Sequence, residues 1–259
     1  MLSIHSFFKK KKQNDIQYIH VESTNSTNDY LRNLTPVSSE SSQPKMIVVS
    51  ADFQTAGRGQ GSNHWESEKG KNLMFSLLCH PVMLPIPSQF LISEAHALSL
   101  FDVLSKYADG FSIKWPNDIY WHDKKICGTL IETSISNGHI RDCIIGTGVN
   151  VNQTEFLSDA PNPISLKQIT GQDHDPQVLL KEIVEQFEHY FECIVNGDYA
   201  EITTRYMSYL YRQKGFFKYR DRDGEFDAAI VEVEDNGHLI LRDKEGCIRS
   251  YHFKEVEFL

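Results

Sequence analysis

Residues 46–65 read MIVVSADFQTAGRGQGSNHW, an apolar run that ends in a polar, glycine-rich loop. The β-branched residues within Met46–Asp52 predict a buried strand. The three glycines of residues 57–61 permit unusual backbone angles and a close approach of the backbone to a ligand. Arg58 adds a planar, permanent cation suited to a carboxylate or a phosphate. Because glycine-rich loops are common, a flexible surface loop is the alternative interpretation.

Regular apolar patterns on both sides of this loop predict a sheet covered by helices. The expected strands, besides Met46–Asp52, are Ile16–Val21, Asn72–Leu78, Phe111–Lys114, Ile119–Trp121, Lys125–Ser134 and Ile140–Val151. The expected helices are Asp29–Leu34 capped by Thr27 or Asn28, an amphipathic helix over Ser88–Tyr107, a core helix over Pro176–Val195 with Val178 on its buried face, and Tyr199–Arg212. These elements favour an α+β fold with a mixed or antiparallel sheet.

The sequence pattern changes after about Lys214. Asp-Gly, Asn-Gly and Glu-Gly turn signals at residues 223–224, 236–237 and 245–246 separate short alternating segments, which is typical of a small β-barrel or meander. We therefore expect three parts. They are an N-terminal tail over residues 1–15, a large domain over residues 16–213 and a small β-domain over residues 214–259.

Composition excludes several classes of protein. The 259 residues carry a net charge of −9, which argues against a dedicated nucleic-acid binder. Five cysteines without a CxxC pair indicate reduced thiols in a cytoplasmic protein. The eleven histidines form no HxxxH or HExxH motif, so we expect no structural zinc site. No window is long and apolar enough to span a membrane, and Lys9–Lys12 is interpreted as part of a solvated tail.

Two later segments place charged side chains at the ends of expected strands. KWPND at residues 114–118 surrounds a proline-fixed turn, where Asp118 could help hold Mg²⁺ and Lys114 could meet a phosphate. In KKICGTLIE, Lys125 stands at a strand mouth near Gly128, within reach of a carboxylate or α-phosphate. A rigid loop with its own ion pair and a surface lysine are the respective alternatives.

Two further segments offer neutral hydrogen-bonding groups. GTGVNVN at residues 146–152 places Asn150 where an amide could hold a planar ring such as adenine, although asparagine is also common in turns. The segment Ser26-Thr27-Asn28, paired with Gln54, follows two expected strands and could recognise a neutral polar ligand such as a ureido group. Helix capping is the alternative for the two hydroxyl residues.

Taken in this order, the segments STNDYL, QTAGRGQGSNHWES, KWPND, KKICGTLIE and GTGVNVN resemble the biotin–protein ligases. The resemblance spans roughly residues 20–152 and the C-terminal β-module. It implies the fold shared with lipoate ligases and with the catalytic domain of class II aminoacyl-tRNA synthetases. A mixed sheet with helices would precede a small SH3-like β-barrel, and residues 16–213 would be the catalytic domain that binds biotin and ATP.

The resemblance also implies roles for individual residues, with Arg58 and Lys125 as the catalytic cations. The residues implied for biotin are Ser26, Thr27, Asn28, Gln54, Gly57, Arg58, Gly59, Lys125 and Gly128. Those implied for ATP and the adenylate are Arg58, Gln60, Trp65, Lys114, Asn117, Asp118 and Asn150, with Asp118 also a candidate Mg²⁺ ligand. The family loop often reads GRGRxGRxW, and this chain departs from it at Gln60, Ser62 and Asn63.

The implied reaction converts biotin and ATP to biotinyl-AMP and pyrophosphate, and then transfers biotin to a lysine of a biotin carboxyl carrier domain. DNA is not an expected partner, because the chain is acidic and no helix-turn-helix module fits before Ile16. A membrane is not expected either, because no window is long and apolar enough to span one. A homodimer is left open. Ligation of lipoate or octanoate, a non-enzymatic biotin sensor or repressor, and an inactive ligase are the alternatives. Arg58, Lys125 and Asp118 argue against the last.

Overall fold

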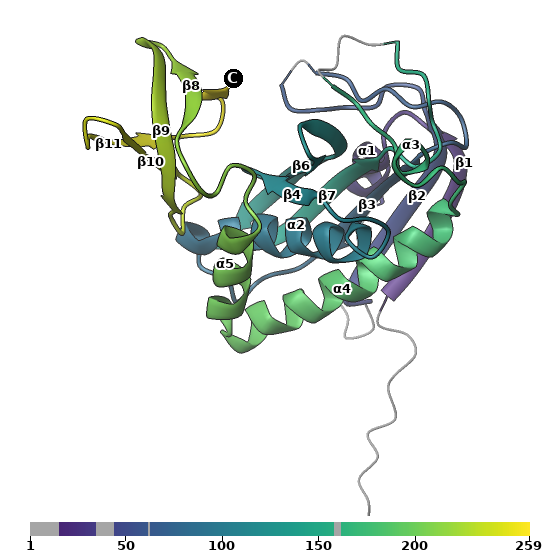
Figure 1. Cartoon of the computed structure of the whole chain (residues 1–259). Helices are drawn as coiled ribbons and strands as arrows, with labels where there is room; N and C mark the ends of the chain where they lie inside the picture. The colour runs from purple at the N-terminus through teal and green to yellow at the C-terminus, as the bar shows by residue number, and fades with distance from the viewer. Residues whose placement is uncertain (1–15, 35–43, 62, 158–161) are drawn as a thin grey trace, which may run out of the picture.

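The computed structural model describes residues 16–34, 44–61, 63–157 and 162–259 (Figure 1). The predictions for the tail over residues 1–15, with Lys9–Lys12, and for Ser62 lie outside these ranges. Two sheets organise the described chain, and each belongs to a different stretch of the sequence.

A seven-stranded mixed sheet forms the centre of the larger unit, in the order β1-β2-β3-β7-β6-β5-β4. Strands β1 and β2 are parallel, whereas the other neighbouring pairs are antiparallel. The strands are β1 (Ile16–Thr24), β2 (Met46–Gln54), β3 (Leu73–Cys79), β4 (Phe111–Lys114), β5 (Asp118–Trp121), β6 (Lys124–Ser136) and β7 (His139–Val149). This sheet confirms the expected fold class, and the strand bounds lie close to the predicted ones.

The sheet separates two layers because successive residues of a strand face opposite sides. Phe75 of β3 and Ile145 of β7 face the main core with α2 and α4, whereas Ser76 and Ile144 face α1. Figure 1 shows α4 running across the α2 side of the sheet. The helices are α1 (Thr27–Asn33), the short 3-10 helix η1 (Ile86–Ser88), α2 (Phe90–Leu104), α3 (Leu166–Thr170), α4 (Pro176–Asn196) and α5 (Tyr199–Ser208).

Helix α2 is buried on nearly every side, so the prediction of an amphipathic helix was wrong. It packs against the sheet, α4 and α5 at once, and polar residues are enclosed with the apolar ones. Burial, with a smaller effect of Asp235, raises the pKa of Glu94 to about 8. Burial lowers the pKa of His96 to about 3, and its Nε2 lies 2.7 Å from the Thr147 hydroxyl. Both side chains are therefore neutral near pH 7.

Three smaller expectations about the helices also differ from the structure. The N-cap of α1 is Ser26, one or two residues before the predicted positions. Val178 in the first turn of α4 is 48% exposed rather than buried, because the core face of that helix begins at Leu179. Helix α5 ends at Ser208, and the chain then runs beside β4, where Ile113 donates to the Tyr209 carbonyl.

The C-terminal unit is a five-stranded antiparallel sheet in the order β11-β10-β9-β8-β12, set apart from the first sheet in Figure 1. Its strands are β8 (Phe217–Asp221), β9 (Gly224–Val233), β10 (Leu239–Asp243), β11 (Ile248–Tyr251) and β12 (Glu257–Phe258). The β9–β10 turn rests on the larger unit, where the Trp115 indole donates to the Gly237 carbonyl at 3.0 Å. A separate β-unit was expected here, and the domain boundary at residue 213 remains a prediction.

Among the described residues, no helix is long and apolar enough to cross a membrane.

Candidate active site

Three glycines of β6 and β7 form the floor of the candidate site, on the face of the sheet that carries α1. Gly128 and Gly148 are paired across the two strands. A Cβ at Gly148 would lie 2.2 Å from the Trp65 ring, and one at Gly128 would lie 3.0 Å from it. A Cβ at Gly146 would lie 2.1 Å from the Asn28 side-chain oxygen. The Trp65 indole and the Asn28 amide therefore rest directly on the strands, which only glycine permits.

A cluster of neutral polar groups lies beside this floor. Gln54 Oε1 accepts hydrogen bonds from the Thr27 backbone at 2.7 Å and from the Thr27 hydroxyl at 3.1 Å. The Ser76 hydroxyl lies 2.7 Å from Thr27 Oγ1 and 2.6 Å from Asn28 Oδ1. The structure thus brings three predicted residues, Thr27, Asn28 and Gln54, together. Ser26 is buried next to them as the N-cap of α1, without a side-chain capping bond.

Arg58 belongs to a four-residue ionic cluster at the α1 end of the site. Its Nη2 lies 2.9 Å from Glu132 Oε2 and 3.2 Å from Asp29 Oδ1. Arg32 contacts the same two carboxylates, each at 2.6 Å. These side chains are about one-third exposed or more, so each pair contributes no more than about 1 kcal/mol to stability. The cluster positions the Arg58 guanidinium, whose Nε is buried without a hydrogen-bond partner among the described residues.

Lys125 lies at the β5 end of the same floor. Its Nζ donates to Asp118 Oδ2 at 2.6 Å, and a Cβ at Gly128 would be 3.1 Å from that Nζ. Lys114 is close by and donates to the Tyr120 hydroxyl at 3.1 Å. Burial lowers the pKa of Lys114, and the charge of Asp118 opposes this effect. Two lysines and one carboxylate therefore meet where β4, β5 and β6 begin or end.

The structure does not bring Arg58 and Lys125 into contact. Arg58 is bound to Glu132, which lies four residues from Gly128 along β6, and four residues of a strand span about 13 Å. Both cations face the same floor, and Trp65 lies on it beside Lys125. Their action on one shared centre remains a prediction, and it requires Arg58 to move along the floor.

The glycine-rich loop is folded tightly on itself. The Gly59 amide donates to the Asn63 carbonyl at 2.7 Å, and a Cβ at Gly57 would lie 2.7 Å from the Trp65 carbonyl oxygen. Gly61 alone of the three loop glycines has a positive φ, of 67°. The Gln60 carbonyl accepts a hydrogen bond from Lys254 of the C-terminal unit at 3.4 Å. The loop, which belongs to the larger unit, therefore also contacts the C-terminal unit.

Two predicted residues use their amides to hold neighbouring segments. Asn117 donates to the Ser93 hydroxyl at 2.9 Å, and Asn150 donates to the Ile164 carbonyl at 3.1 Å. Their roles toward ATP remain predictions.

A cleft of about 1070 Å³ lies between the two units and extends the site. Its lining includes Lys114, Asp118 and Asn63 from the larger unit and Arg249 and Lys254 from the C-terminal unit. Charged groups from both units therefore surround the space next to Lys125.

Sequence reasoning missed Glu132, Asp29, Arg32 and Ser76 as parts of the site. Glu132 follows Gly128 by four positions, so the two-residue period of a strand places both on one face. Ser76 is a lone hydroxyl within the apolar strand LMFSLLC. The positions of Glu132 and Ser76 could have been recognised from the sequence. The pairing of Glu132 with Arg58 could not, because it depends on how distant segments pack.

Comparison with known proteins identifies the class. Residues 20–150, half of the chain, match the model of the Biotin/lipoate A/B protein ligase family, so the chain belongs to that family.

Individual relatives are named as ligases. The bifunctional ligase/repressor BirA of Bacillus subtilis is 30% identical over 214 residues, covering 80% of this chain, but this chain spans 65% of that relative's length. The biotin–[acetyl-CoA-carboxylase] ligase of Paracoccus denitrificans is 28% identical over 230 residues, covering 86% of this chain and 93% of the relative. The Aquifex aeolicus biotin protein ligase solved with biotin and ATP shares the fold, with a TM-score of 0.76 and 24% identity over 94% of this chain and 98% of that chain.

Proposed function

We propose that this protein is a biotin–protein ligase, which activates biotin with ATP and attaches it to a lysine of a carrier domain. One observation carries the proposal. A cluster of neutral polar groups, the buried Thr27 and Ser76 and the partly buried Gln54, adjoins the same glycine floor as the cations Arg58 and Lys125. Such a site suits a ligand with a neutral, hydrogen-bonding head and a carboxylate tail. Biotin has a ureido head of this kind, which a lipoyl or octanoyl chain lacks.

Activation is first a problem of charge. The biotin carboxylate oxygen attacks the α-phosphorus of ATP, and the bond from that phosphorus to pyrophosphate breaks. Both reacting groups are anionic, so the positive charges of Arg58 and Lys125 offset their repulsion. Each cation is paired with a carboxylate in the structure, and the ligand's oxygens replace Glu132 and Asp118 as their partners.

The loop beside the glycine floor offers further hydrogen-bond donors to the intermediate, biotinyl-AMP. Trp65 Nε1 and Arg58 Nε are buried without hydrogen-bond partners among the described residues. A buried donor is costly to leave unpaired, so both favour a bound acceptor. The loop of residues 57–65 carries both groups, and its closure over the site would shield biotinyl-AMP from water.

Asp118 fits the role of a Mg²⁺ ligand. Its carboxylate is partly buried, lines the cleft and lies beside two lysines that suit phosphate oxygens. Mg²⁺ in proteins is commonly held by one or two carboxylates together with substrate phosphates. When bound, the ion would supply charge that helps pyrophosphate depart.

Transfer needs no covalent intermediate on this chain. The carrier lysine's amine attacks the carbonyl carbon of biotinyl-AMP, the bond from that carbon to the AMP oxygen breaks, and the amine loses a proton. The partner is the biotin carboxyl carrier domain of a carboxylase. Because Cys79, Cys127 and Cys143 are free and buried, a reducing cytoplasm is the location we propose.

The direct test is to incubate the protein with ATP, Mg²⁺, biotin and an apo carrier domain, and to measure the intact mass of the carrier. We expect a gain of one biotinyl group that requires ATP. A parallel reaction with lipoate should leave the carrier mass unchanged. A gain with lipoate and none with biotin would replace this proposal by lipoate ligation.

A further inference from the structure

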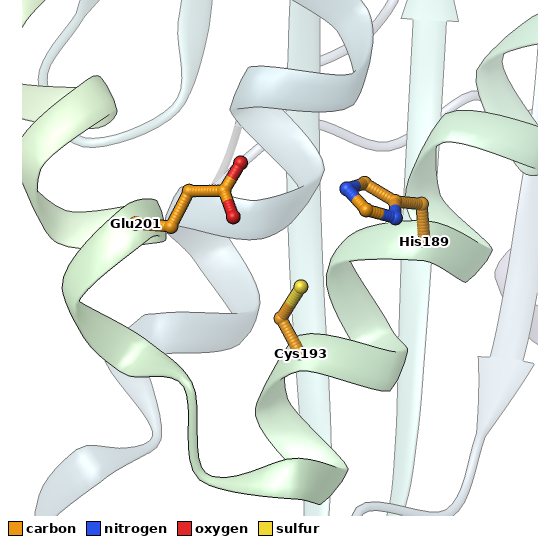
Figure 2. Close-up of side chains that lie close together, drawn as sticks. All are labelled: His189, Cys193 and Glu201. Carbon is orange, nitrogen blue, oxygen red and sulfur yellow. The ribbon is translucent and has the colours of Figure 1, made fainter.

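Three metal-ligating side chains meet on the helical layer, on the opposite side of the sheet from the candidate active site. His189 and Cys193 lie one turn apart on α4, and Glu201 lies in the first turn of α5. One donor atom from each, a ring nitrogen, the thiol sulfur and a carboxylate oxygen, lies within 4.8 Å of both others. Figure 2 shows the three side chains pointing toward a common space between the helices.

We propose that His189, Cys193 and Glu201 form a binding site for a divalent transition metal of the zinc type. Nitrogen, sulfur and oxygen donors are the three kinds of ligand that Zn²⁺ takes in proteins. Tetrahedral coordination separates neighbouring donors by about 3.5 Å, given metal–ligand distances of about 2.0–2.3 Å. Small side-chain rotations therefore close the observed spacing, and a fourth position stays open to water.

The two helices hold these donors on a tight corner. Helix α4 ends at Asn196, Gly197 takes a positive φ of 82°, and α5 begins at Tyr199. The Asp198 amide donates to the Cys193 carbonyl at 2.9 Å, which fixes the corner next to the thiol.

A second set of contacts clamps the same helices farther along. The Tyr190 hydroxyl of α4 donates to Asp102 of α2 at 2.6 Å, and Arg205 of α5 contacts the same carboxylate at 2.7 Å. The donor atoms thus project from a braced frame, which lowers the entropic cost of gathering them around an ion.

The local charge also favours a cation. Glu192 and Asp198 lie near the thiol besides Glu201, and of these Glu192 is also paired with Lys45 at 3.1 Å. His189 and Glu201 are exposed, and neither makes an ion pair or a hydrogen bond to the described part of the chain. Both side chains are therefore available to a ligand.

Sequence motifs had argued against zinc because no HxxxH pair exists. The pair His189-x-x-x-Cys193 has the same one-turn spacing with a thiol in place of the second imidazole, and Glu201 completes it from the next helix.

The test uses the whole protein, stripped of metal with a chelator and kept reduced. Co²⁺ is titrated as a spectroscopic stand-in for Zn²⁺, and the sulfur-to-cobalt charge-transfer band in the near ultraviolet reports thiolate coordination. We expect one equivalent of Co²⁺ to produce the band, and Zn²⁺ to abolish it by displacement. Zn²⁺ affinity is then measured by competition with a chromophoric chelator.

Matched variants identify the ligands. Cys193→Ser should remove the band, whereas Cys247→Ser, at another accessible cysteine, should keep it. Glu201→Gln should weaken Zn²⁺ binding by at least about tenfold, as losses around metal ligands commonly do, and Glu192→Gln should weaken it less.

Absence of the band in the unaltered protein would overturn the site, as would its survival in Cys193→Ser. Equal affinities for Glu201→Gln and the unaltered protein would also contradict it. These readouts do not depend on biotin or ATP, so they stand or fall apart from the proposed ligase activity.

Discussion

Replacing Lys125 by alanine removes one of the two cations from the proposed reaction centre. The Lys125–Asp118 pair is 2.6 Å long, and its side chains are 29% and 27% exposed. A pair with this much solvent contributes roughly 1 kcal/mol at most, so the midpoint of thermal unfolding should fall by no more than about 4 °C for a chain of this size. The loss of one preorganised charge at a reacting anion should slow adenylate formation by about 10²–10³-fold.

The neighbouring lysine provides the matched control for this substitution. Lys124 is exposed and starts the same strand, so Lys124→Ala should change the free energy of unfolding by no more than about 0.5 kcal/mol and leave the rate of adenylate formation unchanged. The assay is biotin-dependent release of pyrophosphate without a carrier, together with thermal unfolding of both variants. A Lys125→Ala protein that forms biotinyl-AMP at the rate of the Lys124→Ala protein would refute the role of Lys125.

Three other changes test separate features. Arg58→Ala should weaken biotin binding and slow adenylate formation by at least about tenfold. If the calorimetric affinity for biotin and the rate of adenylate formation were both unchanged, the glycine-rich loop would not be part of the site. Gly148→Ala places a Cβ 2.2 Å from the Trp65 ring, so the ring must shift. The tryptophan fluorescence should change and the ligase activity should fall. An unaltered emission spectrum with full activity would contradict this packing. The Glu94 pKa of about 8 exceeds the ordinary value of 4.5 for a glutamate, so the folded state binds more protons than the unfolded state between those values. Stability therefore falls as pH rises through that window, by at most about 5 kcal/mol. Glu94→Gln should flatten this decline in denaturant titrations from pH 5 to about pH 9, and an equally steep decline would rule out Glu94 as its source.

Much of the fold could be predicted because its signals are local. The apolar run Met46–Asp52 and the turn signals after Lys214 each report their own segment. The structure extends the first to β2 (Met46–Gln54) and places five short strands in the second region. Helix α2 was misjudged because its polar residues, such as Glu94 and His96, are buried by neighbours that are remote in sequence.

The candidate site was predictable as a set of residues but not as a geometry. Motif order pointed to Thr27, Gln54, Arg58 and Lys125, and all four lie around one face of the sheet. The carboxylate that pairs with Lys125, Asp118, is only 7 residues away in the sequence, whereas Glu132, which pairs with Arg58, is 74 residues away and is brought there by packing. The sequence pattern therefore could not show that Glu132 pairs with Arg58.

The most direct test of the central claim is to supply biotin labelled with oxygen-18 in its carboxylate and to determine the mass of the AMP released during ligation. If a carboxylate oxygen attacks the α-phosphorus at this site, AMP should carry one labelled oxygen. Unlabelled AMP, formed while the carrier still gains biotin, would show that no mixed anhydride forms and would contradict the proposed role of the two cations.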